Sequence, residues 1–595
     1  MNLTSDLEKV IRRFALHNAF LHHGKANDKA VLGKILADRL DLRPQVKELL
    51  VEITAIVSEI NSKSESTIKN ELEVLAPELL HKEKQEKHIE LPELENIGSD
   101  KQVVMRFAPG PSGPLHIGHS RAIILNDEYV KRYSGKFILR LEDTNPQNIE
   151  PDAYDMIQED LGWLGVKYNE MYRQSDRFGI YLKFAQELLS LGCAYICTCP
   201  VEHWRELKSN GQACPDRELP VFDHLERWEK MMAREYEPGQ VSYIVKTDLT
   251  HPNPAVRDFV GYRIVEHPHP LTNDKYYIYP TYNFSVAIDD HLMGITHILR
   301  GKDHLNNTIR QKYVYNYMGW QLPEFLHYGW VSLPDVILKT SVIKDGIRSG
   351  KYTDWSDIQL GTLRALSRRG IHPEAIRKYW LDMGVKDVDI TFSWETLYAI
   401  NKDLVDKNAN RYFFVWDPVE IIITDATKLV GHAPLQPDNP SKGTRNTVLV
   451  KEKCKISRPG SDSGLGLNPG TEQKIDGIRI YVPVDDIETL QAGTKIRLKD
   501  LGNIELISVD PKNISTAKYL DNDLGILKTG VKIIHWISVN DNFQITIYLP
   551  DGSYKEGYCE NDTVKSLGSI IQFERFGFVQ LGSSTSPLIG WFAHK

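Results

Sequence analysis

Residues 106–121 read RFAPGPSGPLHIGHSR, and this stretch decides the fold of the central part of the chain. Residues 102–108, which overlap the start of this stretch, form a short apolar run of the kind found in buried strands. Residues 109–114 are rich in proline and glycine, which exclude regular structure, and helical spacing of apolar residues begins at Ile117. We therefore predict a strand, a rigid turn and a helix, which make half of a βαβ nucleotide-binding unit.

The first turn of the predicted helix carries two histidines at helical spacing. His116 and His119 flank Gly118, and both imidazoles can point at one anion. The free N–H groups and the positive end of the helix dipole suit a phosphate there. Gly118 would let a ligand approach the backbone. The same residues also fit a proline-rich loop that caps a core helix, so the two interpretations stay open at this point.

The motif PLHIGH at 114–119 resembles the HIGH signature of class I aminoacyl-tRNA synthetases, and the longer stretch from Arg106 resembles their glutamyl/glutaminyl branch. The resemblance extends over residues 101–595. It implies activation of L-glutamate by ATP and Mg²⁺ and transfer to tRNA(Glu), with His116 and His119 as catalytic residues. The ATP-binding residues that it implies in this stretch are Pro109, Gly110, Pro111, Ser112, Gly113, His116, Gly118 and His119.

Two further blocks resemble the amino-acid site of archaeal-type glutamyl-tRNA synthetases: KFILRLEDTNP at 136–146, and residues 275–304, which end in THILRGKDH. An arginine suits a carboxylate because its guanidinium makes a bidentate fork. Taken alone, Arg300 fits an ordinary ion pair at a strand end equally well. The glutamate-binding residues that the resemblance implies are Arg106, Ala108, Glu142, Tyr282 and Arg300.

Residues 337–343 resemble the mobile KMSKS loop that folds over the ATP phosphates in class I synthetases. Lys339, Thr340 and Ser341 form the polar part of this stretch and are the implied ATP contacts, with Lys339 also a catalytic candidate. Val342 stands where the second lysine of the loop is expected, and Lys344 is the candidate to replace it. Which lysine contacts ATP stays open.

A cysteine cluster with the spacing C-x-C-x14-C follows the first half of the nucleotide domain. Cys197, Cys199 and Cys214 are candidate zinc ligands, since zinc takes four nitrogen or sulfur ligands and some members of the family hold it in this insertion. Asp216 stands where a fourth ligand is expected. Small buried thiols without a metal fit the same spacing equally well.

The fold class that we predict is multidomain α/β plus all-β, because one core rarely exceeds ~300 residues and short alternating segments replace helical patterns from about residue 406. The predicted parts are a helical appendage (1–80), a charged linker (81–100), the first half of a Rossmann-like catalytic domain (101–199), an insertion (200–270), the second half (271–344), a helical stem (345–405) and two β-barrels (406–595). The resemblance implies that the insertion binds the tRNA acceptor end and that the barrels bind the anticodon.

The net charge of −8 does not indicate a general nucleic-acid binder, so any RNA contact must come from a local basic patch. Arg364, Arg368 and Arg369 form the clearest such patch and are candidate tRNA contacts, although a solvated helix face is the common alternative. No apolar run approaches the ~20 residues that span a bilayer, and the N-terminus has no secretory signal. We expect a cytoplasmic monomer without membrane contacts.

Other functions also fit parts of this pattern. The nearest alternative is a glutaminyl-tRNA synthetase, which Arg300 and Glu142 disfavour because an amide gives a guanidinium no anionic partner. A small-molecule nucleotidyltransferase with an HxGH site would not need barrels or a basic stem. A non-catalytic RNA-binding relative would be expected to lack His116, His119 or the pocket arginines, and all of these are present. Whether tRNA(Gln) is also charged, and whether the N-terminal helices dock a partner, stay open.

Overall fold

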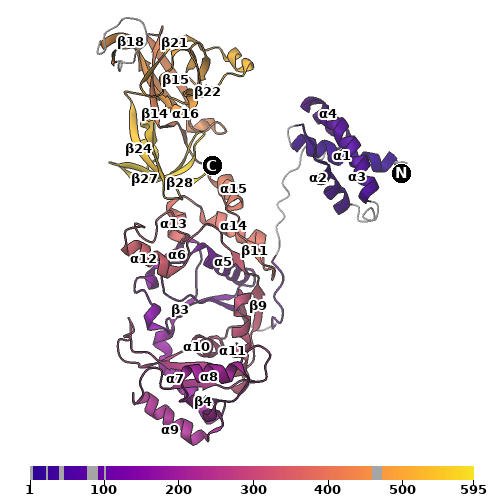
Figure 1. The fold of residues 1–595 in the computed structure, drawn as a ribbon, viewed down its shortest axis with the longest axis vertical. Coiled ribbons are helices and arrows are strands. Elements are labelled where there is room, and N and C mark those ends of the chain that lie inside the picture. Colours follow the sequence, from indigo (N-terminus) through magenta and orange to yellow (C-terminus); the bar gives the residue numbers. More distant parts are fainter. Residues whose placement is uncertain (1–4, 22–23, 39–45, 77–90, 99–101, 458–471) are drawn as a thin grey trace. The chain divides into compact units, whose positions relative to one another are not determined.

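A computed structural model describes the chain except for residues 1–4, 22–23, 39–45, 77–90, 99–101 and 458–471 (Figure 1). Its contacts divide the chain into two compact units, Met1–His88 and Ile89–Lys595, which are described separately. Among the described residues, no helix combines the length and the apolar character that crossing a membrane requires.

The first unit is helical. Its amphipathic helices bury one shared core, in which Ile11, Ile53 and Leu72 are almost fully inaccessible to solvent. Ser64 caps the last helix by accepting a hydrogen bond from the N–H of Thr67. Of the predicted linker, residues 91–98 are described and form neither helix nor strand, and the remainder lies outside the described residues. The helices are α1 (Ser5–Leu21), α2 (Asp28–Asp38), α3 (Val46–Asn61) and α4 (Glu65–Leu75).

The second unit begins with a parallel sheet. The N–H of Thr296 donates to the carbonyl of Val104 at 3.0 Å, which places β8 beside β1 and gives the order β3-β2-β1-β8-β9. This is the order of a doubly wound fold, whose ligand crevice lies at the carboxyl ends of the strands where the order reverses, here between β1 and β8. The strands are β1 (Val104–Phe107), β2 (Lys136–Leu141), β3 (Glu170–Arg173), β8 (His297–Gly301) and β9 (Glu324–Tyr328).

Helices and a second sheet complete this region. The antiparallel sheet β4-β5-β6-β7 extends on both sides of the insertion that the sequence predicts for residues 200–270, because its outer strands lie at 194–197 and 278–280. The helices are α5 (Ile117–Arg132), α6 (Ala153–Trp163), α7 (Phe178–Ser190), α8 (Val201–Ser209), α9 (Val221–Met232), α10 (Tyr282–Leu292) and α11 (Leu305–Tyr317). The strands are β4 (Ala194–Cys197), β5 (Ser242–Val245), β6 (Phe259–Ile264) and β7 (Ile278–Pro280).

A helical stem follows and is hydrogen-bonded to the loop after β1. The N–H of Leu363 donates to the carbonyl of Leu115 at 2.9 Å, and that of Ile117 donates to Gly361 at 3.0 Å. The stem and the sheet share one hydrophobic core, which includes the fully buried Trp380. The elements are β10 (Val331–Ser332), α12 (Thr340–Arg348), α13 (Leu363–Arg368), α14 (Pro373–Met383), β11 (Ile390–Thr391) and α15 (Trp394–Val405).

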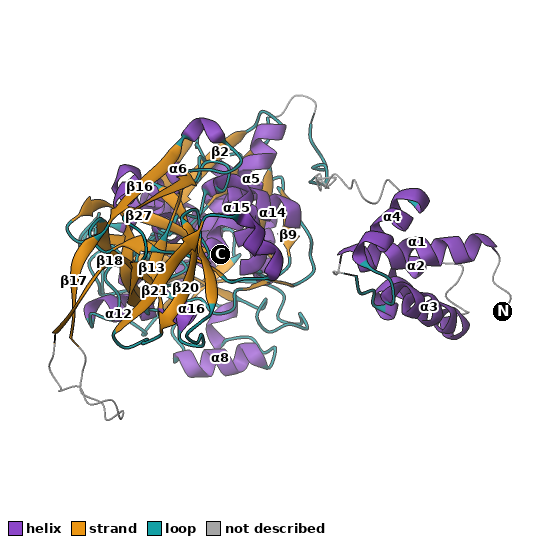
Figure 2. Cartoon of the chain, turned by 90° about the horizontal axis from the view of Figure 1, so that it is seen from above, coloured by secondary structure: helices purple, strands orange, loops and turns teal. Residues whose placement is uncertain are grey.

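The remaining described residues form an all-β region, as predicted, and its strands are among those drawn in orange in Figure 2. Their pairing closes two barrels. In the inserted barrel, residues 533–538 pair with β19 through β22 and with β18 through β23, so the path of paired strands returns to β18. A hairpin, β15 (Lys428–Pro434) with β16 (Thr444–Val450), and the helix α16 (Val484–Ile487) accompany it. Its strands are β14 (Pro418–Thr424), β17 (Glu452–Ser457), β18 (Glu472–Pro483), β19 (Lys495–Leu498), β20 (Gly502–Ser508), β21 (Ile514–Asp521), β22 (Ile533–Ile534) and β23 (Ile537–Ser538).

The carboxyl-terminal barrel closes in the same way but uses an early segment of the chain. Residues 411–416 pair with β26 through β12 and with β25 through β13. The sequence does not predict that the inserted barrel interrupts this one, because strand patterns do not reveal their partners. The strands are β12 (Arg411–Tyr412), β13 (Phe414–Trp416), β24 (Asn542–Tyr548), β25 (Tyr554–Glu560), β26 (Ile570–Phe573), β27 (Gly577–Thr585) and β28 (Leu588–His594).

Arg369 joins the stem to the carboxyl-terminal barrel. Its side chain is buried, and its guanidinium donates to the carbonyls of Phe592 and Ala593 at 3.2 and 2.8 Å and to the Tyr398 hydroxyl at 2.9 Å. Arg369 therefore lies outside the basic surface that the sequence predicts. The side chain that the sequence assigned to a tRNA contact instead connects the stem to the carboxyl-terminal barrel.

Replacing Arg369 with Ala should lower the free energy of unfolding by about 3 kcal/mol, because one buried and two partly buried acceptors lose a charged donor. Urea unfolding followed by tryptophan fluorescence measures this difference. Arg348→Ala is the control, since that side chain is 77% exposed and should change stability little. Equal unfolding curves for the two variants would contradict the structural role of Arg369.

Candidate active site

The loop between β1 and α5 lies at the carboxyl edge of the parallel sheet. Two backbone hydrogen bonds attach it to the chain after β2: Glu142 N–H to Pro109 at 2.9 Å, and Glu150 N–H to Pro111 at 2.8 Å. A Cβ added at Gly113 would lie 3.0 Å from the Thr340 side chain. The loop and the start of α12, which are distant in sequence, therefore meet at one edge of the crevice.

His116 and His119 cap α5 with their own side chains. The Nδ1 of His116 accepts from the N–H groups of Gly118 and His119 at 3.1 and 3.3 Å, and the Nδ1 of His119 accepts from the N–H of His116 at 3.3 Å. The rings stack with centroids 3.6 Å apart. Because each Nδ1 is an acceptor, a neutral ring must carry its proton on Nε2. Each neutral histidine therefore keeps one N–H group, on Nε2, as a possible donor.

Burial keeps both imidazoles neutral. It lowers the pKa of His116 to about 4, and burial together with the nearby His116 lowers the pKa of His119 well below its usual value.

The sequence interpretation of Gly118, as a position that lets a ligand approach the backbone, needs a correction. A Cβ at Gly118 would lie 3.0 Å from the His116 ring and 3.2 Å from Leu333, so the glycine makes room for this stacked pair.

The predicted KMSKS-like stretch forms the amino end of α12. Lys339 precedes the first turn, and both Lys339 and Ser341 are exposed beside the Gly113 turn. Lys344 pairs with Glu150 at 2.7 Å, so its charge already has a partner. Val342 is 46% exposed. Of the two lysines considered for ATP, Lys339 is the one presented to solvent at the edge of the loop.

Arg300 is buried at the carboxyl end of β8 and, among the described residues, donates hydrogen bonds to neutral groups only. Its guanidinium donates to the Thr308 hydroxyl at 2.6 Å, to the Gln311 side-chain oxygen at 2.9 Å and to the Tyr282 hydroxyl at 3.4 Å. Its Nε has no hydrogen-bond partner among the described residues. Burial lowers the pKa of Arg300. A buried guanidinium is costly unless an anion accepts its hydrogen bonds, so Arg300 is suited to binding an anionic group.

Arg106, in contrast, has a carboxylate partner within the chain. Its Nε and Nη2 donate to the two carboxylate oxygens of Asp290, at 3.0 and 3.3 Å. Asp290 lies on α10 and is 1% exposed. Burial alone would raise the pKa of Asp290, but the charges of Arg106 and Arg140 outweigh it and lower the pKa to about 2. The sequence prediction gave Arg106 to the substrate, but the fork that would bind a carboxylate is already occupied by Asp290.

Sequence reasoning missed Arg140, which is fully buried in β2. It donates to Asp290 at 2.6 Å and to Glu142 at 3.0 Å. The signal was present, because an arginine inside the apolar strand KFILRL requires a buried partner. Burial raises the pKa of Glu142, and the charges of Arg140 and Arg106 counteract this effect.

Tyr282 lies among these groups at the start of α10. Burial raises its pKa to about 12, Glu142 adds to the shift, and Arg300 and Arg106 oppose it. Its hydroxyl also lies 3.3 Å from the Nδ1 of His304. The structure thus gathers the predicted Arg106, Glu142, Tyr282 and Arg300 in one place, with Ala108 directly after β1.

Comparisons with known proteins agree with this geometry. Residues 102–407 match the catalytic domain of the class I tRNA synthetases for E and Q, and residues 409–459 match the anticodon-binding domain of the same group. This chain belongs to that family. The resemblance predicted from the HIGH motif is thereby confirmed.

Curated relatives match the chain along its whole length. The glutamate–tRNA ligase of Methanocaldococcus jannaschii is 46% identical over 592 residues, which cover 99% of this chain and 100% of that protein. The glutamate–tRNA ligase of Pyrococcus furiosus is 44% identical over 602 residues, with the same coverage. That of Methanoculleus marisnigri is 42% identical over 598 residues, and both chains are fully covered.

Two of the three basic residues that the sequence assigned to tRNA, Arg364 and Arg368, lie on α13 of this class I synthetase. Arg364 pairs with Glu159 and, at 3.2 Å, with Asp160. Arg368 lies 3.3 Å from Asp354 and is partly exposed. Both side chains are therefore at the surface of the stem, but each already contacts a carboxylate.

The predicted cysteine cluster comes together in the synthetase's insertion. The sulfur of Cys214 lies 3.3 Å from that of Cys197 and 3.2 Å from that of Cys199. With an oxygen of Asp216, these possible ligand atoms all lie within 4.8 Å of one another. Asp216 also accepts from Thr198 and Arg227. Three sulfurs and a carboxylate oxygen fit the donor set of zinc.

The neutral capping histidines predict a pH dependence of stability. The folded pKa of His116, about 4, lies below its usual 6.5, so below pH 6.5 the unfolded chain binds protons that the folded chain does not. The free energy of unfolding should therefore fall as the pH falls from 6.5 towards 4. In His116→Asn, whose amide oxygen can still cap α5, this slope should be smaller. Equal slopes in urea titrations across this range would show that His116 titrates normally.

Proposed function

We propose that this chain is a glutamate–tRNA ligase that activates L-glutamate with ATP and transfers it to the 3′-terminal adenosine of tRNA(Glu). The observation that carries the proposal is Arg300, a buried guanidinium that has no carboxylate partner among the described residues. The names of the full-length relatives support the same activity.

The charges around the crevice favour a substrate with one net negative charge. The pocket brings together three buried guanidinium groups, those of Arg106, Arg140 and Arg300. The carboxylates of Glu142 and Asp290 pair with Arg140 and Arg106. A third carboxylate, that of Asp289, lies 3.9 Å from Arg140 and pairs with a fourth guanidinium, that of Arg177, at 2.7 Å. Among the described residues, Arg300 is therefore left without a carboxylate partner. Glutamate brings the missing negative charge in its side chain, whereas glutamine brings none, so Arg300 argues against the glutaminyl alternative.

In the proposed reaction, an α-carboxylate oxygen of glutamate attacks the α-phosphorus of ATP and pyrophosphate leaves. A hydroxyl of the terminal adenosine then attacks the acyl carbon and AMP leaves. No protein nucleophile is needed, because positioning and stabilisation of developing charge are sufficient. Mg²⁺ enters bound to the ATP phosphates.

Each part of the crevice has a role in this proposal. The Nε2–H groups of His116 and His119 would donate to the phosphate oxygens, and Lys339 would reach the polyphosphate from α12. Glu142 would bind the ammonium group of glutamate. The remaining proposed ATP contacts are Pro109, Gly110, Pro111, Ser112, Gly113, Gly118, Thr340 and Ser341.

The tRNA surface that we propose on the stem includes Arg364 and Arg368 and leaves out the buried Arg369. We further propose a cytoplasmic monomer. Aminoacylation of purified tRNA(Glu) and tRNA(Gln) by the purified protein tests the activity and decides whether tRNA(Gln) is a second acceptor.

Replacing Arg300 with Ala should lower kcat/KM for glutamate by at least a hundredfold, because losing a buried charge partner costs about 3 kcal/mol or more. The value for glutamine should change much less. Both are measured in the presence of tRNA, with the exposed Arg348→Ala as control. If the ratio of the two kcat/KM values does not move towards glutamine, Arg300 does not select the substrate.

We also propose that Cys197, Cys199, Cys214 and Asp216 bind zinc, which would stabilise the insertion when bound. Metal analysis should find one zinc per chain in the wild type and much less in Cys199→Ser. Cys193→Ser is the matched control, because Cys193 lies outside the cluster. A metal-free wild type with normal stability would favour plain buried thiols.

A further inference from the structure

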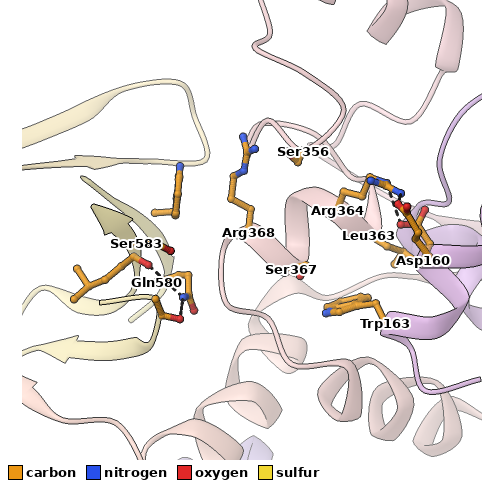
Figure 3. A pocket seen from close by; sticks show the side chains of 13 residues that line it. Asp160, Trp163, Ser356, Leu363, Arg364, Ser367, Arg368, Gln580 and Ser583 are labelled. Carbon is orange, nitrogen blue, oxygen red and sulfur yellow. Dashed lines mark hydrogen bonds and ion pairs between the residues drawn. The ribbon is translucent and has the colours of Figure 1, made fainter. Parts of the chain in front are cut away.

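A cavity of about 620 Å³ lies where the stem meets the carboxyl-terminal barrel (Figure 3). One wall comes from α6 and α13, with Trp163 and Ser367, and the other comes from β27 and β28, with Ser583 and Trp591. Figure 3 shows Gln580 and Ser583 facing Arg368 across this space. The volume lies within the range typical of small-ligand sites, roughly 300–1,000 Å³.

The charges on the cavity wall have partners within the chain. Arg364 pairs with Asp160 at 3.2 Å, and Arg368 lies 3.3 Å from Asp354. A phosphate would have to compete with these carboxylates for both guanidinium groups. The cavity therefore favours a neutral ligand over an anion.

The rest of the lining suits a flat group with polar edges. Trp163 and Trp591 are both half-buried, so part of each ring is accessible. The Arg368 guanidinium lies 5.6 Å from the centre of the Trp591 ring and extends the stacking surface. Ser367, Ser583 and Gln580 add hydroxyl and amide groups at the rim. Aromatic rings, an arginine plane and neutral hydrogen-bonding groups are the elements that bind unpaired bases.

We propose that this cavity binds one unpaired nucleobase of the tRNA substrate, an inference that rests on the function proposed above. The family comparison places the catalytic domain on one side of the cavity. The other wall belongs to the barrel whose first strands, at 411–416, lie within residues 409–459, which match the anticodon-binding domain. A tRNA that contacts both domains must pass this junction. A base inserted here would hold the tRNA in place between its contact with the catalytic domain and its contact with the anticodon-binding domain.

Ser583→Trp tests the proposal by filling the cavity. Ser583 and Ser584 are consecutive exposed residues of β27, and of the two only Ser583 lines the cavity. Ser584→Trp is therefore the matched control. The measurement is the Kd for a tRNA(Glu) transcript at several salt concentrations.

We expect Ser583→Trp to raise the Kd about tenfold, the loss of one stacked base, with an unchanged slope of log Kd against log salt concentration. Ser584→Trp should bind as the wild type does. Trp591→Ala should weaken binding as Ser583→Trp does, and Trp591→Phe should restore most of it. A slope smaller by about one unit would mean a lost phosphate contact and would overturn the base assignment.

An unchanged Kd in both Ser583→Trp and Trp591→Ala would also overturn the proposal. Failure of the proposed function has a different signature. In that case the wild type itself does not attach glutamate to tRNA(Glu), whatever the variants do.

Discussion

The carboxylate of Asp290 is the interaction on which the crevice depends. It receives Arg106 from β1 and Arg140 from β2, so one buried anion joins two neighbouring strands to α10. Removing it would leave two guanidinium groups buried and uncompensated, at a cost of several kcal/mol. Because Arg140 also holds Glu142, the same anion sets the position of the group proposed to bind the ammonium. Asp290 and Glu142 neutralise the charges of Arg106 and Arg140. The charge of Arg300 is therefore the one left for a substrate carboxylate in the proposed reaction.

The sequence predicts the order of the elements and the members of the crevice, because strand, turn and helix patterns are local and the motifs are long. It does not predict which arginine is free. Arg106 and Arg300 look alike in the sequence, and only the tertiary contact with Asp290 separates them. The prediction that Arg369 contacts tRNA is wrong for the same reason. A helix with several arginines looks basic, but burial against the barrel is decided by residues more than 200 positions away.

Gly118 shows a second limit of sequence reasoning. A glycine beside two histidines suggests space for a ligand, whereas the space is filled by the His116 ring. The two histidines cap the helix and present their Nε2–H groups, so one arrangement serves both the fold and the proposed chemistry. A pattern of residue types cannot distinguish these uses, because both need the same residues at the same spacing.

The interrupted carboxyl-terminal barrel has a consequence for synthesis on the ribosome. Residues 411–416 emerge before the inserted barrel, but their strand partners, β25 and β26, end at Glu560 and Phe573. The inserted barrel can close as soon as residue 538 has left the exit tunnel. The first strands of the other barrel, β12 and β13, have no partner for their backbone hydrogen bonds until β25 and β26 have been synthesised. Release of the nascent chain and completion of this barrel are therefore almost simultaneous.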